Sequence, residues 1–369
     1  MLHRGRVARP RHWQAIFIQL KISMKAKRKL PLLNSPGSFS ADAKESAAGE
    51  PRDTTECFGF LLMPEFSMLS FASVLEPLRM ANRMSQTKLY DWQLFSPDND
   101  VVRSSNGIEF SPTRRLEEST DIDTLIVVAG IKPLKHSNSA LLNWLRDLAR
   151  RGVRLGATST GPLILARAGL LNSYKSTIHW ENLDAFREQY PGIFASAELF
   201  ECDRDRFTCS GGTAGLDLMM HLIGLRHGKK LAYSVAEQCI HPKIRPAHDL
   251  QRMALPVRFS VDHPRLLAAI SHMETHLEDP LASSTIGELV GLSQRQFERL
   301  FRERLGTTTA RFYKRLRLER ATALLEQTSM SILQVAVACG FASAAHFSSS
   351  YEQLFGSSPH AVRLRLRNT

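Results

Sequence analysis

The stretch GATSTGPLILARAGLL, residues 156–171, joins a small-residue strand end to an alanine- and leucine-rich run through a tight polar turn. Enzymes built on α/β sheets present a nucleophile in this way, on a sharp turn between a strand and a helix. The turn carries Ser159, flanked by Thr158 and Thr160. The stretch therefore predicts an α/β sheet here, and Ser159 is either a nucleophile or a contact in a pocket that only binds.

Apolar strand-like runs alternate with helical runs on both sides of this turn. We expect buried strands at 57–63, 91–96, 123–130 and 153–157, short strands near 176–180, 197–202 and 206–211, and helices at 66–82, 139–152, 161–169, 181–189 and 213–227. This order predicts a doubly wound parallel α/β sheet covered on both faces. Ligand sites of such sheets form at the carboxyl ends of the strands, where residues 158–161 lie.

Residues 291–312 and 340–362 repeat one pattern at a spacing of fifty residues. Phe297 matches Phe347, Phe301 matches Tyr351, and Gly306 matches Gly356. Each copy has a short helix (285–290 or 331–338), a glycine-containing turn and a longer helix, and this is a helix-turn-helix used twice. The amphipathic run 311–327 would join the copies as one helix, so that both enter successive major grooves about 34 Å apart.

The longer helix of the first copy has the composition of a DNA-recognition helix. Ser293 is a good N-cap, and Phe297, Leu300 and Phe301 form its buried face. The residues left pointing outwards are Gln294, Arg295, Glu298, Arg299 and Arg302. Arginine near the start of such a helix can bind guanine in the major groove. The alternative is a solvated basic face on an ordinary helix bundle, which the repeat disfavours.

Residues 263–369 resemble the AraC-type DNA-binding domain in the motifs LVGLSQRQFERLFRERLG, RLERATALLEQT and VAVACGFASAAHFSSSYEQLFGSSP. The resemblance implies base- or phosphate-facing positions at Arg295, Glu298 and Arg299 in the first recognition helix. In the second helix it implies them at Ala344, Ala345, His346 and Ser349. Many members carry arginine where this chain has Ser349, so we expect the first copy to supply most base readout. Arg363, Arg365 and Arg367 would add phosphate contacts.

Residues 55–245 resemble the amidotransferase-like domain of the ThiJ/PfpI superfamily in DTLIVVAG, GATSTGPLILARAGLL and STIHWENLDAF. This domain fused upstream of an AraC-type module defines the GlxA-type transcriptional regulators. The enzyme relatives carry cysteine at the elbow, an acidic residue on the first helix and a histidine downstream. The matching residues here are Ser159, Glu76 and His179.

The chemistry of this elbow favours binding over catalysis. A cysteine thiolate is accessible near neutral pH, whereas serine needs a dedicated, oriented base. The other features suit an anion with an attached cation, such as an amino acid or a quaternary amine. We expect backbone N–H groups of Thr160, Gly161, Gly130 and Ile131 to face the anion, Ser159, Thr160, His179 and Glu76 to add hydrogen bonds, and Trp180 to stack on the cation. Each has a structural alternative: Glu76 on the surface, His179 as a satisfied histidine, Trp180 in the core and Ser159 bridging the turn.

The distribution of charge along the chain indicates its domains and a class of partner. The net charge is +12, with nine Lys/Arg and no acid in residues 1–30 and thirteen Lys/Arg against nine Asp/Glu in residues 263–369. Basic ends predict a polyanionic partner. We expect a disordered basic leader at 1–52, a ligand-sensing domain at 53–245, a linker at 246–262 and a DNA-binding domain at 263–369. No membrane segment is expected, the five cysteines lack CxxC spacing, and no cofactor or metal is expected.

These features together predict a cytoplasmic transcriptional regulator, in which a small-molecule effector bound to the first domain controls promoter binding by the second. Double-stranded DNA, RNA polymerase and a second copy of the chain are the expected partners, and activation is the expected output. The alternative is a DNA-tethered amidase, deglycase or peptidase of the ThiJ/PfpI kind that uses Ser159.

Overall fold

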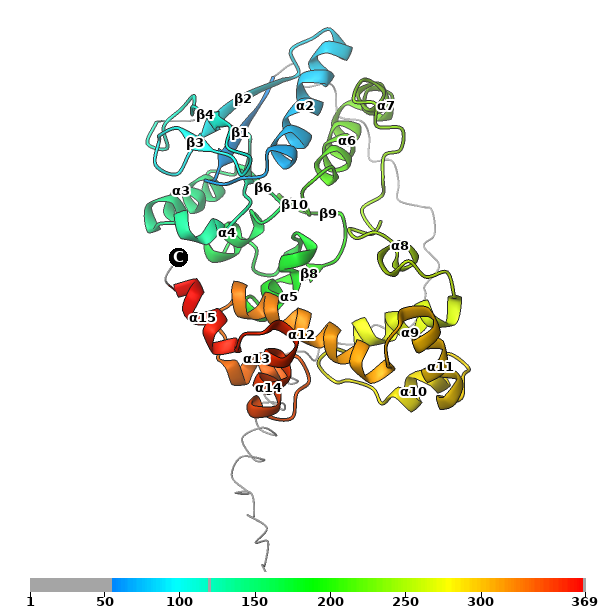
Figure 1. Cartoon of the computed structure of the whole chain (residues 1–369). Helices are drawn as coiled ribbons and strands as arrows, with labels where there is room; N and C mark the ends of the chain where they lie inside the picture. The colour runs from blue at the N-terminus through cyan, green and yellow to red at the C-terminus, as the bar shows by residue number, and fades with distance from the viewer. Residues whose placement is uncertain (1–54, 119–120, 368–369) are drawn as a thin grey trace, which may run out of the picture. The chain divides into compact units, whose positions relative to one another are not determined.

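A six-stranded sheet forms the centre of the first part of the chain (Figure 1). The computed structural model describes residues 55–118 and 121–367, so the expected leader at 1–52 lies outside the described residues. The chain divides between Arg252 and Met253 into two units, here called the α/β unit and the helical unit. Within the described residues, no helix is long and apolar enough to cross a membrane.

The sheet has the strand order β2-β1-β5-β6-β10-β9. Neighbouring strands pair in parallel except β9 and β10, which pair antiparallel and place β9 at the edge. The six strands are β1 (Glu56–Leu62), β2 (Tyr90–Phe95), β5 (Thr124–Val128), β6 (Arg154–Thr158), β9 (Phe200–Asp203) and β10 (Arg206–Cys209). The predicted doubly wound sheet is therefore confirmed, with one antiparallel edge strand that the sequence pattern did not indicate.

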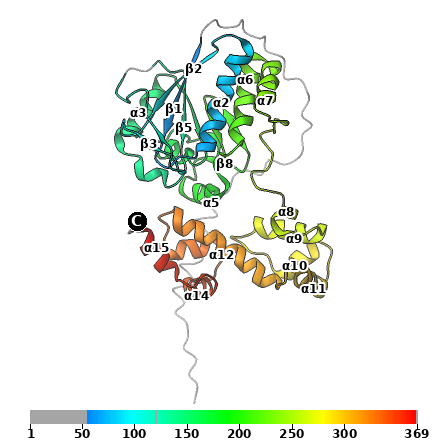
Figure 2. The ribbon, with the colours of Figure 1, turned by 45° about the horizontal axis from the view of Figure 1, so that its top comes forward.

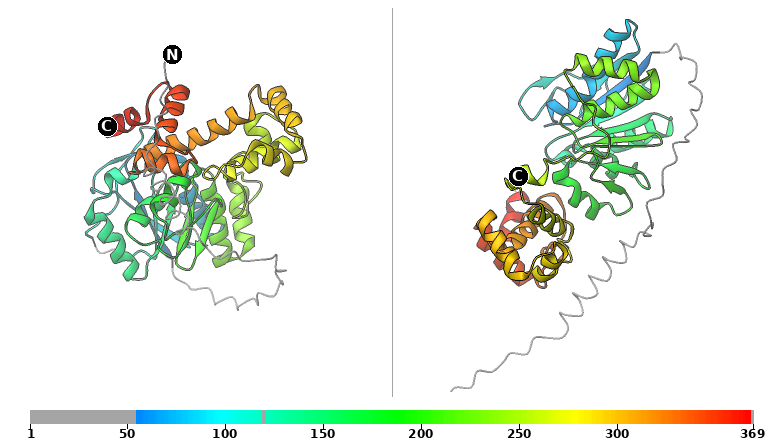
Figure 3. Two further views of the ribbon diagram at one scale, coloured as in Figure 1. Left: turned by 90° about the horizontal axis from the view of Figure 1, so that it is seen from below. Right: turned by 90° about the vertical axis from the view of Figure 1, so that its right-hand side faces the viewer.

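Helices cover both faces of this sheet, as Figures 1 and 3 show. One face carries α2 (Met68–Ser85), α6 (Ala214–His227) and α7 (Lys229–Gln238), and the other carries α3 (Ser139–Arg150), α4 (Pro162–Arg167) and α5 (Trp180–Gln189). Successive strand residues serve opposite faces: Phe60 and Leu62 join the first core, and Leu61 the second. The short elements are β3 (Val102–Arg103), β4 (Glu109–Phe110), η1 (Pro133–His136), β7 (Lys175–Thr177) and β8 (Phe194–Ser196).

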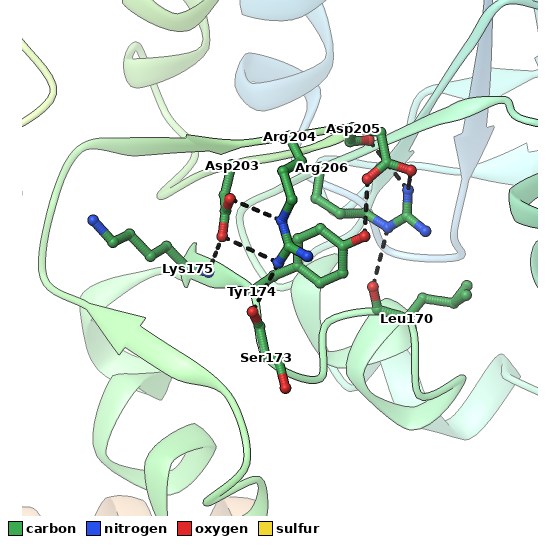
Figure 4. A network of polar contacts seen from close by, with 8 residues as sticks. All are labelled: Leu170, Ser173, Tyr174, Lys175, Asp203, Arg204, Asp205 and Arg206. Carbon is green, nitrogen blue, oxygen red and sulfur yellow. Dashed lines mark hydrogen bonds and ion pairs between the residues drawn. The ribbon is translucent and has the colours of Figure 1, made fainter. Parts of the chain in front are cut away.

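A polar network fixes the turn between β9 and β10 (Figure 4). The Tyr174 hydroxyl donates to Asp205 Oδ1 at 2.9 Å, and the Arg204 guanidinium lies 3.6 Å from the centre of the Tyr174 ring. Arg206 Nε donates to the carbonyl oxygen of Leu170 at 3.0 Å. The network lies at the amino end of β10, while Ser159 is level with the carboxyl end. The network therefore fixes the strands at the end opposite to Ser159.

The long helix α12 (Thr309–Gln327) joins two three-helix groups of the helical unit, and Figure 2 shows it between them. The helices of the first group are α9 (Pro264–Thr275), α10 (Ser283–Leu289) and α11 (Gln294–Leu305), and those of the second are α13 (Ile332–Ala338), α14 (Ala344–Phe355) and α15 (Pro359–Arg367). Phe297 and Phe301 are fully buried in the first group, and Phe347 and Tyr351 take the same positions in the second. The two predicted helix-turn-helix units are thus present.

The stretch predicted as a linker, residues 246–262, is ordered structure that belongs to both units. The Leu199 backbone N–H donates to the carbonyl oxygen of Ala247, and Leu250 forms a β-bridge with Glu198, so the chain up to Arg252 packs on the α/β unit. Beyond it, α8 (Leu255–Phe259) and Val261 pack in the core of the helical unit. Four prolines in residues 241–264 and the lack of a clear periodicity suggested a linker, but the residues around them make specific contacts.

Candidate ligand pocket and nucleic-acid interface

Ser159 occupies a strained turn directly after β6. Its φ is +60°, in the left-handed region that costs a non-glycine residue about 1 kcal/mol or more. Two neighbours hold it there: the Ser159 N–H donates to the Cys209 carbonyl oxygen at 3.1 Å, and the Ser159 carbonyl oxygen accepts from the His179 N–H at 3.2 Å. Strain fixed in this way is typical of functional turns, so Ser159 has the backbone geometry of an elbow.

The elbow lacks the partners that would activate a serine. Within the described part of the chain, the Ser159 hydroxyl has no hydrogen-bond partner, and the Thr160 hydroxyl donates to the Gly130 carbonyl oxygen at 2.7 Å. His179 Nδ1 lies 3.7 Å from a carboxylate oxygen of Glu181 rather than against Ser159. Burial lowers the pKa of His179, so the imidazole is neutral at pH 7. A serine nucleophile needs a base that accepts its proton, and the histidine nearest in sequence to that role has Nδ1 beside Glu181.

Glu76, predicted to lie beside the elbow, points elsewhere. Its carboxylate accepts from Arg79 Nε and Nη2 at 2.9 and 2.6 Å, and its side chain is 42% exposed. Ser70 takes the expected place, because its hydroxyl accepts from the Gly212 N–H at 2.9 Å, and Gly211 packs against Ser159. Glu76 lies six residues further, about 9 Å along α2 and rotated away from Ser70. The expected acidic contact is therefore replaced by a serine.

Gly130 and Ile131 also differ from expectation. The Ile131 N–H donates to the Glu65 carbonyl oxygen at 3.1 Å, so it is already used inside the protein. The Gly130 carbonyl oxygen accepts from Thr160, as described above. These residues fix the loop after β5 and do not form the predicted pair of free donors.

An open pocket of about 170 Å³ lies next to the elbow, on the side of β10 and α6. Its wall includes His179 and Trp180, which the sequence predicted. The pocket residues that the sequence did not predict are Leu199, Ser210, Gly211, Gly212, Thr213, Ala214, Arg245 and Gln251. A cavity of about 150 Å³ can hold a molecule the size of benzene, so this pocket suits a small ligand.

The missed residues come from two sources. Gly211 and Gly212 have φ values of +90° and +57° and lead into the N-terminus of α6, so the run SGGTAGLD (210–217) carried a readable signal. Arg245 is the last residue of the predicted ligand-sensing domain and Gln251 lies in the predicted linker, and no pattern indicated a pocket at either position. Arg245 donates from Nε and Nη2 to the fully buried carboxylate of Asp217 at 2.9 and 2.6 Å.

Trp180 is 39% exposed, and its ring already faces a cation. The Arg252 guanidinium carbon lies 4.3 Å from the ring centre. Trp180 is thus neither core packing nor an empty aromatic cage. A cationic ligand group at this ring would have to replace Arg252 or share the ring with it.

In the helical unit, α11 presents an arginine face. Arg295, Arg299 and Arg302 are exposed and lie within about 60° of one another on the helix, opposite Phe297. Ser293 and Gln296 form a capping box, so the Ser293 hydroxyl is engaged at the helix start, and Gln294 is exposed beside it. Glu298 lies on the flank, where its carboxylate accepts from the Thr309 N–H at 3.4 Å. Arg299 Nε lies 3.7 Å from Glu303 Oε1, and both side chains are exposed, so the basic face of α11 is accessible to a polyanion.

The same face of α14 carries no cation. Fifty residues on, Ala345, Ser349 and Glu352 stand where α11 has Arg295, Arg299 and Arg302, and all three are exposed. Ala344 is partly buried, and the His346 ring packs against Phe341 with centroids 5.7 Å apart. The two recognition helices share a fold but differ in charge.

The tail arginine nearest to α14 is structural. Arg363 Nη1 and Nη2 donate to the carbonyl oxygens of Thr328 and Met330 at 2.7 and 2.8 Å, so Arg363 holds the turn before α13. This corrects the expectation that it contacts phosphate. Arg365 is exposed, and the Arg367 side chain lies outside the described residues.

A groove of about 550 Å³ runs between the first half of α12 and the second half of α14. Its cations, Arg311, Lys314 and Arg315, lie on α12, and Ser350 and Gln353 line it from α14. The Thr309 N–H, next to the groove residues Thr308 and Ala310, donates to the carboxylate of Glu298 on α11. The sequence indicated this helix as a connection between the two units, and its periodicity did not indicate a basic face.

Fold and site define a class: an α/β domain with a nucleophile-type elbow, joined to a double helix-turn-helix. The DJ-1/PfpI family matches residues 69–224, and a helix-turn-helix domain matches residues 286–365. The HTH-type transcriptional regulator CdhR of Pseudomonas aeruginosa is 46% identical over 306 residues, which cover 83% of this chain and 91% of the relative. The regulator GlxA of Rhizobium meliloti is 37% identical over 320 residues, covering 86% and 99%.

A solved structure of an AraC family transcriptional regulator from Pseudomonas putida is 30% identical, covers 50% of this chain and 99% of that one, and aligns with a TM-score of 0.45. The chain belongs to the family of HTH-type transcriptional regulators that join a DJ-1/PfpI domain to an AraC-type helix-turn-helix domain. The predicted GlxA-type architecture is confirmed, and the enzyme alternative is not favoured by these relatives.

Proposed function

We propose that the chain is a sequence-specific transcriptional regulator in which α11 reads bases and a small ligand in the α/β unit sets DNA binding. The observation that carries the first part is the face formed by Arg295, Arg299 and Arg302, which α14 replaces by Ala345, Ser349 and Glu352. Arginine contacts to guanine discriminate bases, whereas alanine and serine contribute shape and methyl contacts. Base readout is therefore concentrated in the first helix-turn-helix.

The test compares Arg299→Ala with Arg304→Ala on an operator selected from random DNA with the full chain. Both arginines are exposed on α11, but Arg304 lies on the helix side that carries Phe297. Arg299→Ala should lose about 1–3 kcal/mol of discrimination between operator and random DNA. Arg304→Ala should retain it. Equal discrimination in Arg299→Ala and the unmodified chain would refute this assignment.

The effector site in this proposal is the pocket beside Ser159, Gly211 and Thr213. The α6 N-terminus and Arg245 favour an anionic group, and the buried Gln251 Oε1, which has no hydrogen-bond partner among the described residues, accepts from an N–H donor. A zwitterion such as an amino acid satisfies both poles. A quaternary amine offers no N–H to Gln251 and would bind through Trp180.

We propose that this pocket binds without turnover and that Ser159 is a ligand contact. The absence of an oriented base at the Ser159 hydroxyl, within the described residues, supports this. We further propose that the protein acts in the cytoplasm and binds paired half-sites as a homodimer. Its expected output is activation of transcription through RNA polymerase. Sedimentation of the full chain with and without operator tests the dimer, and in vitro transcription tests activation.

A further inference from the structure

One segment of the α/β unit both lines the pocket and leads to the helical unit. Residues 241–252, here called the strap, follow α7 and end where the chain passes into the helical unit at Met253. Two strap residues, Arg245 and Gln251, form part of the pocket wall, and a third, Arg252, covers the Trp180 ring. The rest of the wall belongs to the α/β core.

The amino end of the strap is anchored on a buried carboxylate. Asp217 of α6 is fully buried, and its Oδ1 lies 2.9 Å from His241 Nε2 and accepts from the Arg245 N–H at 2.6 Å. Its Oδ2 accepts from the Arg245 guanidinium, and Arg245 Nη2 also donates to the Thr213 hydroxyl at 2.9 Å. The turn at the α6 N-terminus and the strap are therefore tied through one side chain.

The carboxyl end of the strap is held by the Gln251 side chain and by a β-bridge. Gln251 Nε2 donates to the Thr177 hydroxyl at 2.9 Å, to the Ile178 carbonyl oxygen at 3.2 Å and to the Glu198 carbonyl oxygen at 2.8 Å. The β-bridge between Glu198 and Leu250 lies next to it. The Gln251 side chain thus reaches into the core with its nitrogen and leaves its buried oxygen without a partner among the described residues.

A ligand in this pocket contacts the core and the strap at once. Its binding free energy then depends on the strap position, and by linkage its presence changes the strap equilibrium. The strap residue Arg252 is followed directly by Met253, so a change in the strap acts on the point where the helical unit begins. Nothing else in the pocket wall has this connection along the chain.

We propose that the strap is the element that transmits pocket occupancy to the DNA-binding unit, and that Arg245 and Gln251 are its ligand-contacting residues. The proposal rests on the proposed function and adds the route of regulation to it.

The test locks the strap with a reversible disulfide in the full chain. Glu198 and Leu250 lie opposite each other in an antiparallel bridge, where Cα atoms are about 4.5–5.5 Å apart, a spacing that a disulfide accepts. Neither side chain lines the pocket. The double variant Glu198→Cys, Leu250→Cys is compared oxidised and reduced, with Glu198→Cys alone and the unmodified chain under the same conditions to account for the five native cysteines.

The readout is operator affinity with and without each standard amino acid and glycine betaine at saturating concentration. The reduced double variant should respond to one of these probes by a factor of about 5–150, the range of typical coupling between sites, and the oxidised form should not respond. Equal responses in both forms would overturn the strap proposal while leaving the effector function intact. A reduced form that binds operator but responds to no probe would contradict the effector function itself, and the strap proposal with it.

Discussion

At the residue scale, the elbow shows that backbone geometry and side-chain chemistry can separate. Ser159 keeps the left-handed conformation, whereas the groups around it are a neutral histidine, a serine at position 70 and two glycines at 211 and 212. The elbow itself could be predicted from the sequence, because a polar turn after a strand is a local pattern, whereas His179 was indicated by the resemblance to the ThiJ/PfpI superfamily. Glu76 could not be placed, because which turn of α2 faces the elbow depends on packing.

His179 gives a pH prediction at this scale. Burial lowers its pKa below the usual 6.5, so the unfolded chain binds more protons than the folded chain just below that pH. The free energy of unfolding should therefore fall as pH drops through 6.5. Thermal unfolding of the full chain between about pH 7.5 and pH 5.5 measures this.

The variant His179→Asn removes one of the contributing groups. His221 and His227 also have pKa values lowered by burial, so the variant should keep a reduced decrease rather than none. A decrease in melting temperature as steep as in the unmodified chain would show that His179 is not among the groups responsible.

At the element scale, the periodicity of apolar residues predicted the helices that bury one face and the strands that bury both. It did not reveal α7, which begins directly after Gly228 and buries only the short side chains of Ala232, Val235 and Ala236. It also did not reveal the strap, because a segment that packs by single hydrogen bonds has no repeating pattern. The second helix-turn-helix was visible from its aromatic spacing, whereas the structural role of Arg363 needed the contacts with Thr328 and Met330.

The two turn glycines offer a matched comparison between the helix-turn-helix units. Gly291 and Gly340 have φ values of +70° and +71°. A Cβ at Gly291 meets nothing within 4 Å, but at Gly340 it would lie 2.7 Å from the Glu278 carbonyl oxygen and 2.9 Å from that of Leu277. Gly291→Ala should cost about 1–2 kcal/mol, the left-handed penalty alone.

Gly340→Ala should cost clearly more, because backbone atoms must also move. Urea unfolding of the full chain, followed by the signal of the helical unit, measures both values. Equal costs for the two variants would mean that the turn of the second unit packs less closely against residues 277–280 than described.

The basic groove along α12 gives a second prediction for an element. Arg311→Gln should weaken binding to operator and random DNA alike and reduce the slope of log affinity against log salt by about one, as expected for a phosphate contact. Arg304→Gln, an exposed arginine outside the groove, is the control. A loss confined to operator DNA would instead place Arg311 at a base.

At the scale of the whole molecule, the basic faces and the small-molecule pocket lie in different units. The excess of basic residues lies at the two ends of the chain, and the described cations that face outwards on α11 and α12 belong to the helical unit. The α/β unit contributes a small polar pocket and the strap that leads out of it. The two-domain organisation could be predicted from the change between a strand–helix pattern and an all-helical pattern along the sequence. The boundary between the two units could be placed only from the contacts of Leu199, Glu198 and Gln251.

The most direct measurement is the operator affinity of the full chain in the presence of each standard amino acid and glycine betaine, with the concentration of each compound followed by NMR in the same sample. We expect at least one compound to change operator affinity by about fivefold or more and to remain intact. Consumption of that compound, abolished by Ser159→Ala, would contradict a binding role of the elbow and make it an active site.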